Sequence, residues 1–488
     1  MTVRKRYIIL VVLLACTFGK VIAPVCAQTL EERYRAFQQS AKKTYADFRD
    51  EANNRYAAFL AEAWKECPPD TTVTEPKRNW EPPVVYEEPV TPEPPAQLPV
   101  EQATNAVYVD ERPEPVAEVT ENREPTTRFT ITFYGTPVSF RHPKLNAIKL
   151  TKVTEKQIAK AWQTLAGAEF DNLLYDCLSA RDKLQLCDYA YGVLLGQVAE
   201  RIYGHTDEAV LLKAFLYAQS GYAMRLASTQ DGRLHMLMGS KYLIFNQQAF
   251  KFGDMYFYPM EDVSAGMLVC EHPFDNEQPM TLLINADQQL AVDTVQQITR
   301  RSRFGIETKT TINRNLIDFY NNYPTGNLGG EIGTRLAIYA NAPLEQSVQR
   351  ELYPTLSAAI QGNSERDAVN KLLNYVQTAF TYEYDDVVWG EDRAFFPLES
   401  LYYPYNDCED RSILFSRLVR DLVHLPVILV YYPGHLAAAV RFNEDVRGDF
   451  LLVDGKKYVV CDPTYIGASV GKAMPQFKNA TAKVITLQ

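Results

Sequence analysis

The sequence lacks any run of eighteen apolar residues, which excludes a protein that crosses a membrane several times. It also lacks an excess of positive charge, because 50 lysines and arginines face 60 aspartates and glutamates and the formal charge is −10. A surface that binds nucleic acid needs clustered basic residues, so nucleic acid is not an expected partner. Cysteine is scarce: the chain has eight, and no two are spaced C-x-x-C. A small disulfide scaffold is therefore excluded, and a structural zinc site is not predicted.

Apolar residues are abundant enough for a large folded protein. Hydrophobic residues make up 46% and charged residues 23% of the 488 positions, which excludes global disorder. The length indicates two to four domains. In an oxidising compartment one or two disulfides could form, with Cys177 and Cys187 as candidates.

Residues 1–27 have the layout of a signal peptide. Basic residues at 4–6 precede an apolar stretch over 7–18, and small residues at 25–27 offer a cleavage site after Ala27. We therefore expect an exported protein, periplasmic or secreted, with no transmembrane domain in the mature chain. Lipidation at Cys16, which would make a lipoprotein, and an uncleaved anchor are the alternatives.

Residues 28–66 carry an eleven-residue repeat of aromatic and alanine side chains. This period keeps the repeated side chains on one stripe of an α-helix and favours a straight or right-handed supercoiled helix. Such a coiled-coil stalk could associate with itself or with an envelope partner through residues 30–66. Alternatively, the helix packs on its own globular domain. The repeated positions are Tyr34, Tyr45 and Tyr56, then Phe37, Phe48 and Phe59, then Ala41, Ala52 and Ala63.

Residues 67–127 form a segment rich in proline and glutamate. Thirteen of the 28 prolines lie between residues 67 and 125. Proline is excluded from helix interiors and central strands, so we expect an extended linker that spaces the N-terminal helix from the globular part. A proline-rich ligand for a partner domain is the alternative.

From residue 128 the sequence is typical of an α+β protein. We expect an α+β domain over 128–265, a β-rich connecting region over 266–345, and a further domain over 346–488. In the last of these, a helix is followed by strands.

The strongest local motif is Asn406-Asp407-Cys408-Glu409-Asp410, followed by apolar residues at helical spacing. Asn406 or Asp407 is a natural N-cap, which places Cys408 at a helix N-terminus. There the helix dipole and free N–H groups stabilise a thiolate, so the motif predicts a sulfur nucleophile.

Two downstream residues complete this constellation. Gly434-His435 opens a predicted strand of small and apolar residues, and Asp462 follows the next predicted strand, Tyr458 to Cys461. An acid at that place could accept the imidazole N–H and fix its tautomer. We interpret Cys461 as a core residue of its strand.

Together, Asp407-Cys408-Glu409-Asp410, Gly434-His435 and Asp462-Pro463-Thr464 resemble the three motifs of the bacterial transglutaminase-like superfamily, over roughly residues 345–488. The resemblance implies a papain-like α+β fold with the cysteine on a helix and the other two residues on adjacent strands. It also implies acyl transfer through a thioester, as in cysteine peptidases, amide hydrolases and, less often, protein cross-linkers. One departure is Ala437, two positions after the histidine, where family members often carry an aromatic residue.

The resemblance implies that Cys408 attacks a carbonyl, that His435 takes and returns the proton, and that Asp462 orients His435. For the oxyanion, Tyr402 and Trp389 are candidate partners of the Cys408 backbone N–H. We expect hydrolysis of a protein or peptide substrate, with no cofactor and no metal. Some animal relatives depend on calcium, but this sequence has no acidic loop that would support calcium binding. In the alternative, Cys408 is a buried thiol and the protein is a catalytically silent envelope scaffold.

An upstream segment over 205–235 parallels the cysteine motif region. It predicts a degenerate second transglutaminase-like copy, with His205 at the place of Cys408 and His235 at that of His435. Without a cysteine this copy could only bind or act as a scaffold. A chance likeness between two helix–strand–strand patterns is the alternative.

Overall fold

The computed structural model describes residues 47–70, 72–75, 82–89, 94–104, 112–119, 121, 127–143, 148–261, 263, 266–390 and 392–488. The chain divides into two units, residues 1–48 and 49–488. The predicted signal peptide and most of the eleven-residue repeat therefore lie outside the described residues. The second unit holds the elements discussed below.

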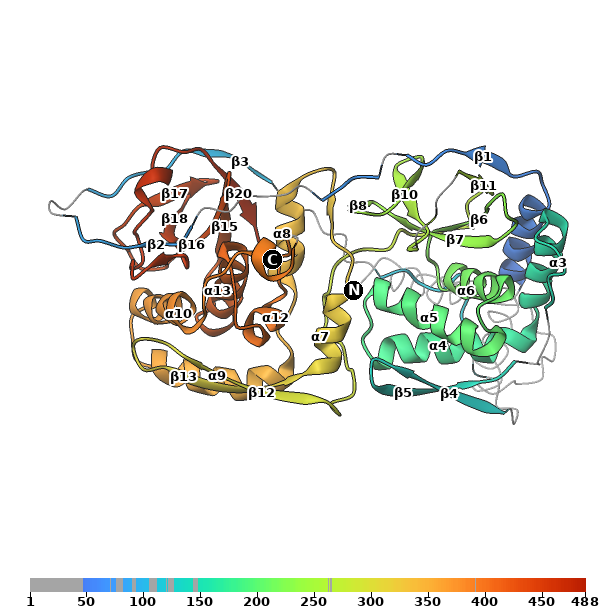
Figure 1. The fold of residues 1–488 in the computed structure, drawn as a ribbon, viewed down its shortest axis with the longest axis horizontal. Coiled ribbons are helices and arrows are strands. Elements are labelled where there is room, and N and C mark those ends of the chain that lie inside the picture. The colour runs from blue at the N-terminus through green and yellow to red at the C-terminus, as the bar shows by residue number, and fades with distance from the viewer. Residues whose placement is uncertain are drawn as a thin grey trace, which may run out of the picture. The chain divides into compact units, whose positions relative to one another are not determined.

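The chain has the predicted α+β class, and the first of two six-stranded sheets lies in its N-terminal half. Its strand order is β1-β11-β6-β7-β10-β9, and the helix α6 that precedes β6 packs against it (Figure 1). The helices of this half are α3 (Glu155–Leu165), α4 (Asp171–Lys183), α5 (Asp188–Tyr203) and α6 (Asp207–Gln219), with a short 3-10 helix, Ala168–Phe170. The strands are β1 (Lys65–Cys67), β6 (Met224–Ser228), β7 (Leu234–Ser240), β9 (Phe250–Phe252), β10 (Met255–Tyr258) and β11 (Met267–Val269).

The second sheet belongs to the C-terminal half and has the order β17-β18-β16-β15-β20-β3. Helix α13 lies against it, with α10 packed on α13 (Figure 1). The helices are α9 (Gln346–Ile360), α10 (Glu365–Ala379), α11 (Asp385–Val388), α12 (Pro397–Tyr402) and α13 (Cys408–Leu422), with a 3-10 turn at Pro475–Phe477. The strands are β3 (Val100–Thr104), β15 (Val427–Tyr432), β16 (His435–Val440), β17 (Phe450–Val453), β18 (Lys456–Cys461) and β20 (Ala482–Thr486).

The two sheets share one topology. Read from one edge of each sheet to the other, the order β1-β11-β6-β7-β10-β9 corresponds to β3-β20-β15-β16-β18-β17. A helix precedes β6 in the first sheet, and another precedes β15 in the second. The first sheet ends in the tight hairpin β9–β10 and the second in the tight hairpin β17–β18. In both sheets, the five strands other than β1 or β3 pair antiparallel with one another. The edge differs, because β1 pairs antiparallel with β11 while β3 pairs parallel with β20.

The region predicted as a β-rich connection over 266–345 is mixed. It holds β11, the hairpin of β12 (Val295–Arg301) and β13 (Glu307–Asn313), and β14 (Gly326–Leu328), but also helices α7 (Arg314–Asn321) and α8 (Ile332–Asn341). Asn313 caps α7 by accepting the N–H of Asn315. Strand β11 belongs to the first sheet, so a boundary at 265 cuts through that sheet. Strand β14 pairs with β8 (Tyr242–Ile244), and β4 (Arg128–Phe133) pairs with β5 (Thr136–Arg141).

The described parts of the predicted linker are integrated into the fold, which corrects the prediction of a free spacer. Strand β3 lies at the sheet edge, and β2 (Val84–Val85) pairs parallel with β19 (Tyr465–Ile466). Leu98 is 1% exposed and packs among apolar side chains of the second sheet. Proline tolerates such edge positions, because a strand at an edge leaves one row of backbone groups without a partner.

The described end of the repeat is helical over residues 47–60, and within the second unit residues 49–60 of this helix pack on the N-terminal half. Tyr56 is 1% exposed, and its ring lies 4.8 Å from that of Trp162. Asn53 accepts hydrogen bonds from Trp162 and Gln219. At these positions the repeated side chains pack on the chain's own globular domain, which was the alternative to a stalk that associates with a partner. Residues 28–46 lie outside the described part.

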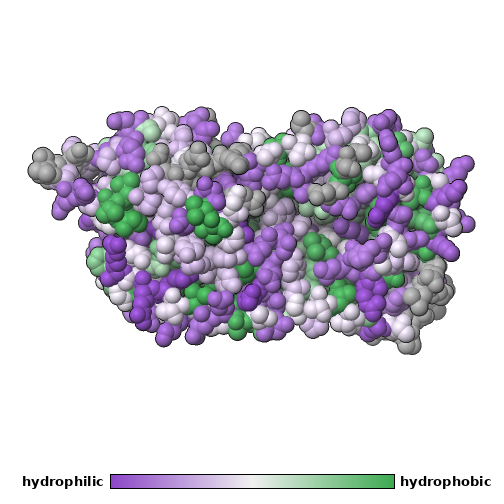
Figure 2. Space-filling view, viewed as in Figure 1, coloured by the Kyte–Doolittle hydropathy of each residue, from purple (hydrophilic) through white to green (hydrophobic). Residues whose placement is uncertain are grey.

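On the face drawn in Figure 2, the described surface is mostly hydrophilic, with hydrophobic residues in separate patches. Cys67, Cys177, Cys187, Cys270, Cys408 and Cys461 are all free thiols, so Cys177 and Cys187 do not form the disulfide considered above. Among the described residues, no helix has both the length and the apolar character needed to cross a membrane.

Candidate functional site

The predicted cysteine motif begins helix α13. Asp407 is the N-cap, and its carboxylate accepts the N–H groups of Glu409 and Asp410. The Asp410 carboxylate in turn accepts the Asp407 N–H, which completes a capping box. Cys408 is therefore the first helical residue, as the sequence predicted.

His435 and Asp462 meet on neighbouring strands. The β15–β16 turn contains Gly434 with φ of +77°, a conformation that favours glycine, and His435 follows as the first residue of β16. Because Ala438 of β16 pairs with Cys461 of β18, Asp462 leaves its strand beside the histidine. The distance from His435 Nε2 to Asp462 Oδ2 is 2.8 Å.

Both side chains of this pair are held firmly. The other oxygen of Asp462 accepts the backbone N–H groups of Thr464 and Tyr465. The His435 ring stacks on Phe477 with centroids 4.8 Å apart. The remaining ring nitrogen, Nδ1, is buried and has no hydrogen-bond partner among the described residues. His435 and Asp462 are 1% and 3% exposed.

The Cys408 sulfur lies beside the same strand, where it accepts the backbone N–H of Leu436. Its environment is not the one predicted for a stabilised thiolate. Burial raises the pKa of the Cys408 thiol well above its usual value, and the carboxylates of Asp407 and Glu409 raise it further. Cys408 is 0% exposed, so the resting thiol is neutral and covered.

The two oxyanion candidates lie in an aromatic cluster. The Trp389 ring contacts Phe395 and Tyr403, and the Tyr402 ring contacts Tyr403. Arg393 lies over Trp389 at 4.7 Å. The ring contacts of both candidates are with neighbouring aromatic side chains.

Tyr382 is a residue near the cysteine that sequence reasoning missed. Burial raises its pKa most, and the next contribution comes from the negative charge of a Cys408 thiolate. Its ring lies under the Arg411 guanidinium at 5.2 Å. Tyr382 follows α10, some 25 positions before the cysteine, and belongs to none of the three motifs.

A buried acidic cluster of Asp385, Asp392 and Glu409 lies next to the cysteine helix. Their carboxylate oxygens lie within 4.8 Å of one another, which is the donor set that a hard cation prefers. Arg335 already places a cation there, 3.7 Å from Asp392 and 4.0 Å from Glu409, and also 2.6 Å from Glu75. Burial first, and then the negative charge of Glu409, raise the pKa of Asp385 to about 8.

Upstream, the equivalent place holds a different set of residues. In the second sheet, Ala438 pairs with Cys461, and His435 lies three residues before Ala438. In the first sheet, Met238 pairs with Tyr258, and His235 lies three residues before Met238. His235 Nδ1 contacts Glu261 Oε1 at 2.7 Å, and its Nε2 contacts Thr229 at 3.3 Å.

The predicted counterpart of Cys408, His205, lies two residues before the first residue of helix α6. Helix α6 begins at Asp207, so this aspartate occupies the first helical position that Cys408 holds in α13. The Asp207 carboxylate accepts the N–H of Leu234. The His205 side chain is 86% exposed and lies 3.4 Å from Glu200.

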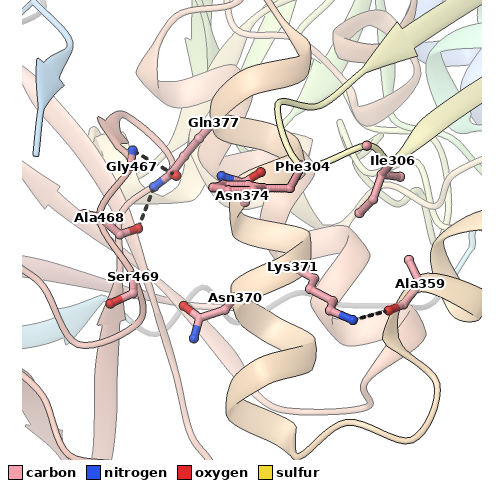
Figure 3. Close-up of a pocket in the computed structure, with 11 residues that line it drawn as sticks. Phe304, Ile306, Ala359, Asn370, Lys371, Asn374, Gln377, Gly467, Ala468 and Ser469 are labelled. Atoms are coloured by element: carbon pink, nitrogen blue, oxygen red, sulfur yellow. Dashed lines mark hydrogen bonds between the residues drawn. The ribbon is translucent and has the colours of Figure 1, made fainter.

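A cavity of about 650 Å³ adjoins the loop that carries Asp462 (Figure 3). Gln377 of α10 holds this loop by donating to the carbonyls of Asp462, Tyr465 and Ala468 and accepting the N–H of Gly467. The cavity therefore shares one wall with the segment that positions the acid of the histidine pair.

Comparison with known proteins adds no relative: no protein-family model, no curated protein and no solved structure matches the chain.

Proposed function

We propose that the chain is a thiol-dependent acyl-transfer enzyme of the transglutaminase-like kind, in which Cys408 attacks an amide carbonyl and water resolves the thioester. The observation that carries the proposal is the free ring nitrogen of His435. A buried histidine nitrogen without a partner costs about 1–3 kcal/mol, so a purely structural histidine would be expected to fill both positions. Here only Nε2 is filled, by Asp462, and the sulfur of Cys408 lies against the next residue of the same strand.

The chemistry follows from these positions. With Nε2 held by Asp462, the lone pair on Nδ1 accepts the thiol proton as sulfur attacks, and the imidazolium that forms is stabilised by the aspartate. The same proton then goes to the leaving amine. Because the thiol is neutral at rest, proton transfer accompanies attack rather than preceding it.

A catalytically silent binding scaffold is the second candidate function. It is favoured by the complete burial of Cys408 and by the raised pKa of its thiol, since both slow the reaction of a nucleophile. Under this proposal, the half of the chain with a cysteine and the half without one serve the same purpose.

Alkylation separates the two. The full chain is treated with iodoacetamide between pH 5 and 9, and labelling of each cysteine is followed by mass spectrometry. An enzyme should label at Cys408 more than tenfold faster than at Cys461, the matched cysteine 0% exposed on β18, and His435→Ala should abolish the difference. Equal, slow labelling of both thiols, with no effect of the variant, would leave only the scaffold.

A further inference from the structure

A cavity of about 400 Å³ lies where the linker meets the C-terminal half of the second unit. The linker forms one wall with Tyr86, Glu87, Pro89 and Pro95. The other walls come from the first turn of α10, from the loop that precedes β17 and from the segment that follows β19. This volume is within the range of cavities that hold small organic molecules.

Hydrogen bonds between these segments fix the walls of the cavity. The backbone N–H of Tyr86 donates to the Ile466 carbonyl. Asp449 joins three segments, because its Oδ1 accepts the N–H of Ala96 and its Oδ2 accepts that of Ala473. Asp449 is 5% exposed, so its carboxylate belongs to the framework of the cavity.

A close contact between two glycines brings two basic residues to the same cavity. A Cβ on Gly448 would lie 2.2 Å from the Cα of Gly471, and Gly471 has φ of +87°. A larger residue at either place would force the two backbones apart. Arg447 precedes the first glycine and Lys472 follows the second, and both line the cavity.

The lining carries an excess of positive charge, although the whole chain has a formal charge of −10. Among the described residues, its basic members are Arg366, Arg447, Lys472 and Lys478, and its acidic members are Glu87 and Asp449. Four cations and two carboxylates leave a local formal charge of +2. Asp449 is held in the framework, with Lys478 at 3.8 Å, which leaves the exposed Glu87 as the acid that an anion must avoid.

The two arginines are available to a ligand. Both are exposed, and neither guanidinium makes an ion pair or hydrogen bond with the part of the chain that the structure describes. Outside the lining, Glu444 accepts the backbone N–H of Arg366, and Glu365 accepts that of Asn443. A guanidinium offers a planar fork of N–H donors that matches a carboxylate or a phosphate group.

We infer that this cavity binds a small organic molecule with two or more oxyanion groups, either carboxylates or phosphates. Arg366 and Arg447 bind the oxyanions, and Lys472, whose ammonium lies 5.6 Å from the centre of the Tyr86 ring, adds a third positive charge. Two arginines from separate segments favour a ligand with more than one anionic group. The inference does not rest on the proposed function, because the lining contains none of the three residues proposed for acyl transfer.

Calorimetric titration tests the inference directly. The full chain is titrated at pH 7 with succinate and with fructose 1,6-bisphosphate, and in parallel with their uncharged counterparts, succinamide and fructose. Low ionic strength is used, because salt screens exposed charges. We expect saturable binding of at least one anion and at least tenfold weaker binding of its uncharged counterpart. The anion that binds more tightly identifies the preferred group as carboxylate or phosphate.

Three variants locate the binding. Arg366→Gln and Arg447→Gln remove one charge each at exposed positions, so they should leave the melting temperature unchanged and weaken binding about fivefold each. The double variant should lose saturable binding. Arg350→Gln is the matched control, because Arg350 is an exposed arginine of α9 outside the lining, and it should bind as the parent does.

Four outcomes would overturn the inference. The parent could bind neither anion, or it could bind the uncharged counterparts as tightly as the anions. The two cavity variants could retain full affinity, or the Arg350→Gln control could lose as much affinity as they do. The last outcome would show a general attraction between the anions and the charge of the chain, with no site at this cavity.

Discussion

Replacing Glu345 by glutamine should stabilise the protein at neutral pH and leave its stability unchanged in acid. Glu345 is the N-cap residue of α9 and is 1% exposed. Its Oε1 accepts a hydrogen bond from the Tyr320 hydroxyl at 2.6 Å, and its Oε2 is buried with no partner in the part of the chain that the structure describes. Burial raises the pKa of this carboxyl from its usual 4.5 to about 8.

The sign follows from proton uptake. Between about pH 4.5 and 8 the folded protein keeps a proton on Glu345 that the unfolded chain releases, so stability falls as the pH rises through that window. At about 1.4 kcal/mol for each unit, the loss reaches about 3 kcal/mol at pH 7 and about 5 kcal/mol above pH 8. Glutamine keeps the oxygen that Tyr320 needs and cannot ionise.

The assay is urea unfolding of parent and Glu345→Gln at several pH values from 4.5 to 8. The difference in free energy of unfolding should be near zero at pH 4.5 and grow to about 3 kcal/mol in favour of the variant at pH 7. Glu331→Gln is the matched control, because Glu331 is the exposed N-cap of α8, and this change should alter the free energy of unfolding by no more than about 0.5 kcal/mol. A difference for Glu345→Gln that is constant across the range would refute the reasoning.

Two further predictions concern buried contacts made by distant parts of the chain. Arg335→Met should lower the free energy of unfolding by about 3–5 kcal/mol at pH 8, because it leaves buried carboxylates without their cation. The loss should be smaller near pH 5, where the raised pKa of Glu409 lets that group take up a proton. Urea unfolding at both pH values checks this, and equal losses would contradict it. Leu98→Ala should cost about 2–5 kcal/mol if the linker is part of the core, while Val85→Ala, at a linker residue 66% exposed, should stay within about 0.5 kcal/mol. Equal melting temperatures for those two variants would show that the linker is a spacer after all.

The local elements of the candidate site could be predicted because each has a short-range cause. The N-cap at Asp407 follows from its side chain, and the strand over 427–432 follows from a run of β-branched and aromatic residues between proline signals. The hairpin glycine before His435 fixes where the next strand starts. Such features depend on a few neighbouring residues, so a single sequence contains them.

The electrostatics of the site could not be predicted, because they depend on residues that are distant in the sequence. The helix N-terminus at Cys408 favours a thiolate, but burial and the nearby carboxylates outweigh it. Arg335 and Glu75 reach the same cluster from α8 and from the linker, and no periodicity in the sequence relates them to residue 409. The incorporation of Leu98 was missed for a similar reason, since proline content describes what a segment cannot form and not what it packs against.

The repeated topology offers an internal comparison for the function of the histidine. In the N-terminal sheet, His235 has both ring nitrogens in contact with partners, Glu261 and Thr229, and the first residue of the preceding helix is an aspartate. In the C-terminal sheet, His435 has one ring nitrogen without a partner among the described residues, and the first residue of the helix is a cysteine. Stability alone would favour the filled arrangement in both halves, by about 1–3 kcal/mol for each buried nitrogen. The half with the cysteine therefore bears this cost and the half without the cysteine does not, and under the proposed function Nδ1 of His435 is the atom that would accept the thiol proton.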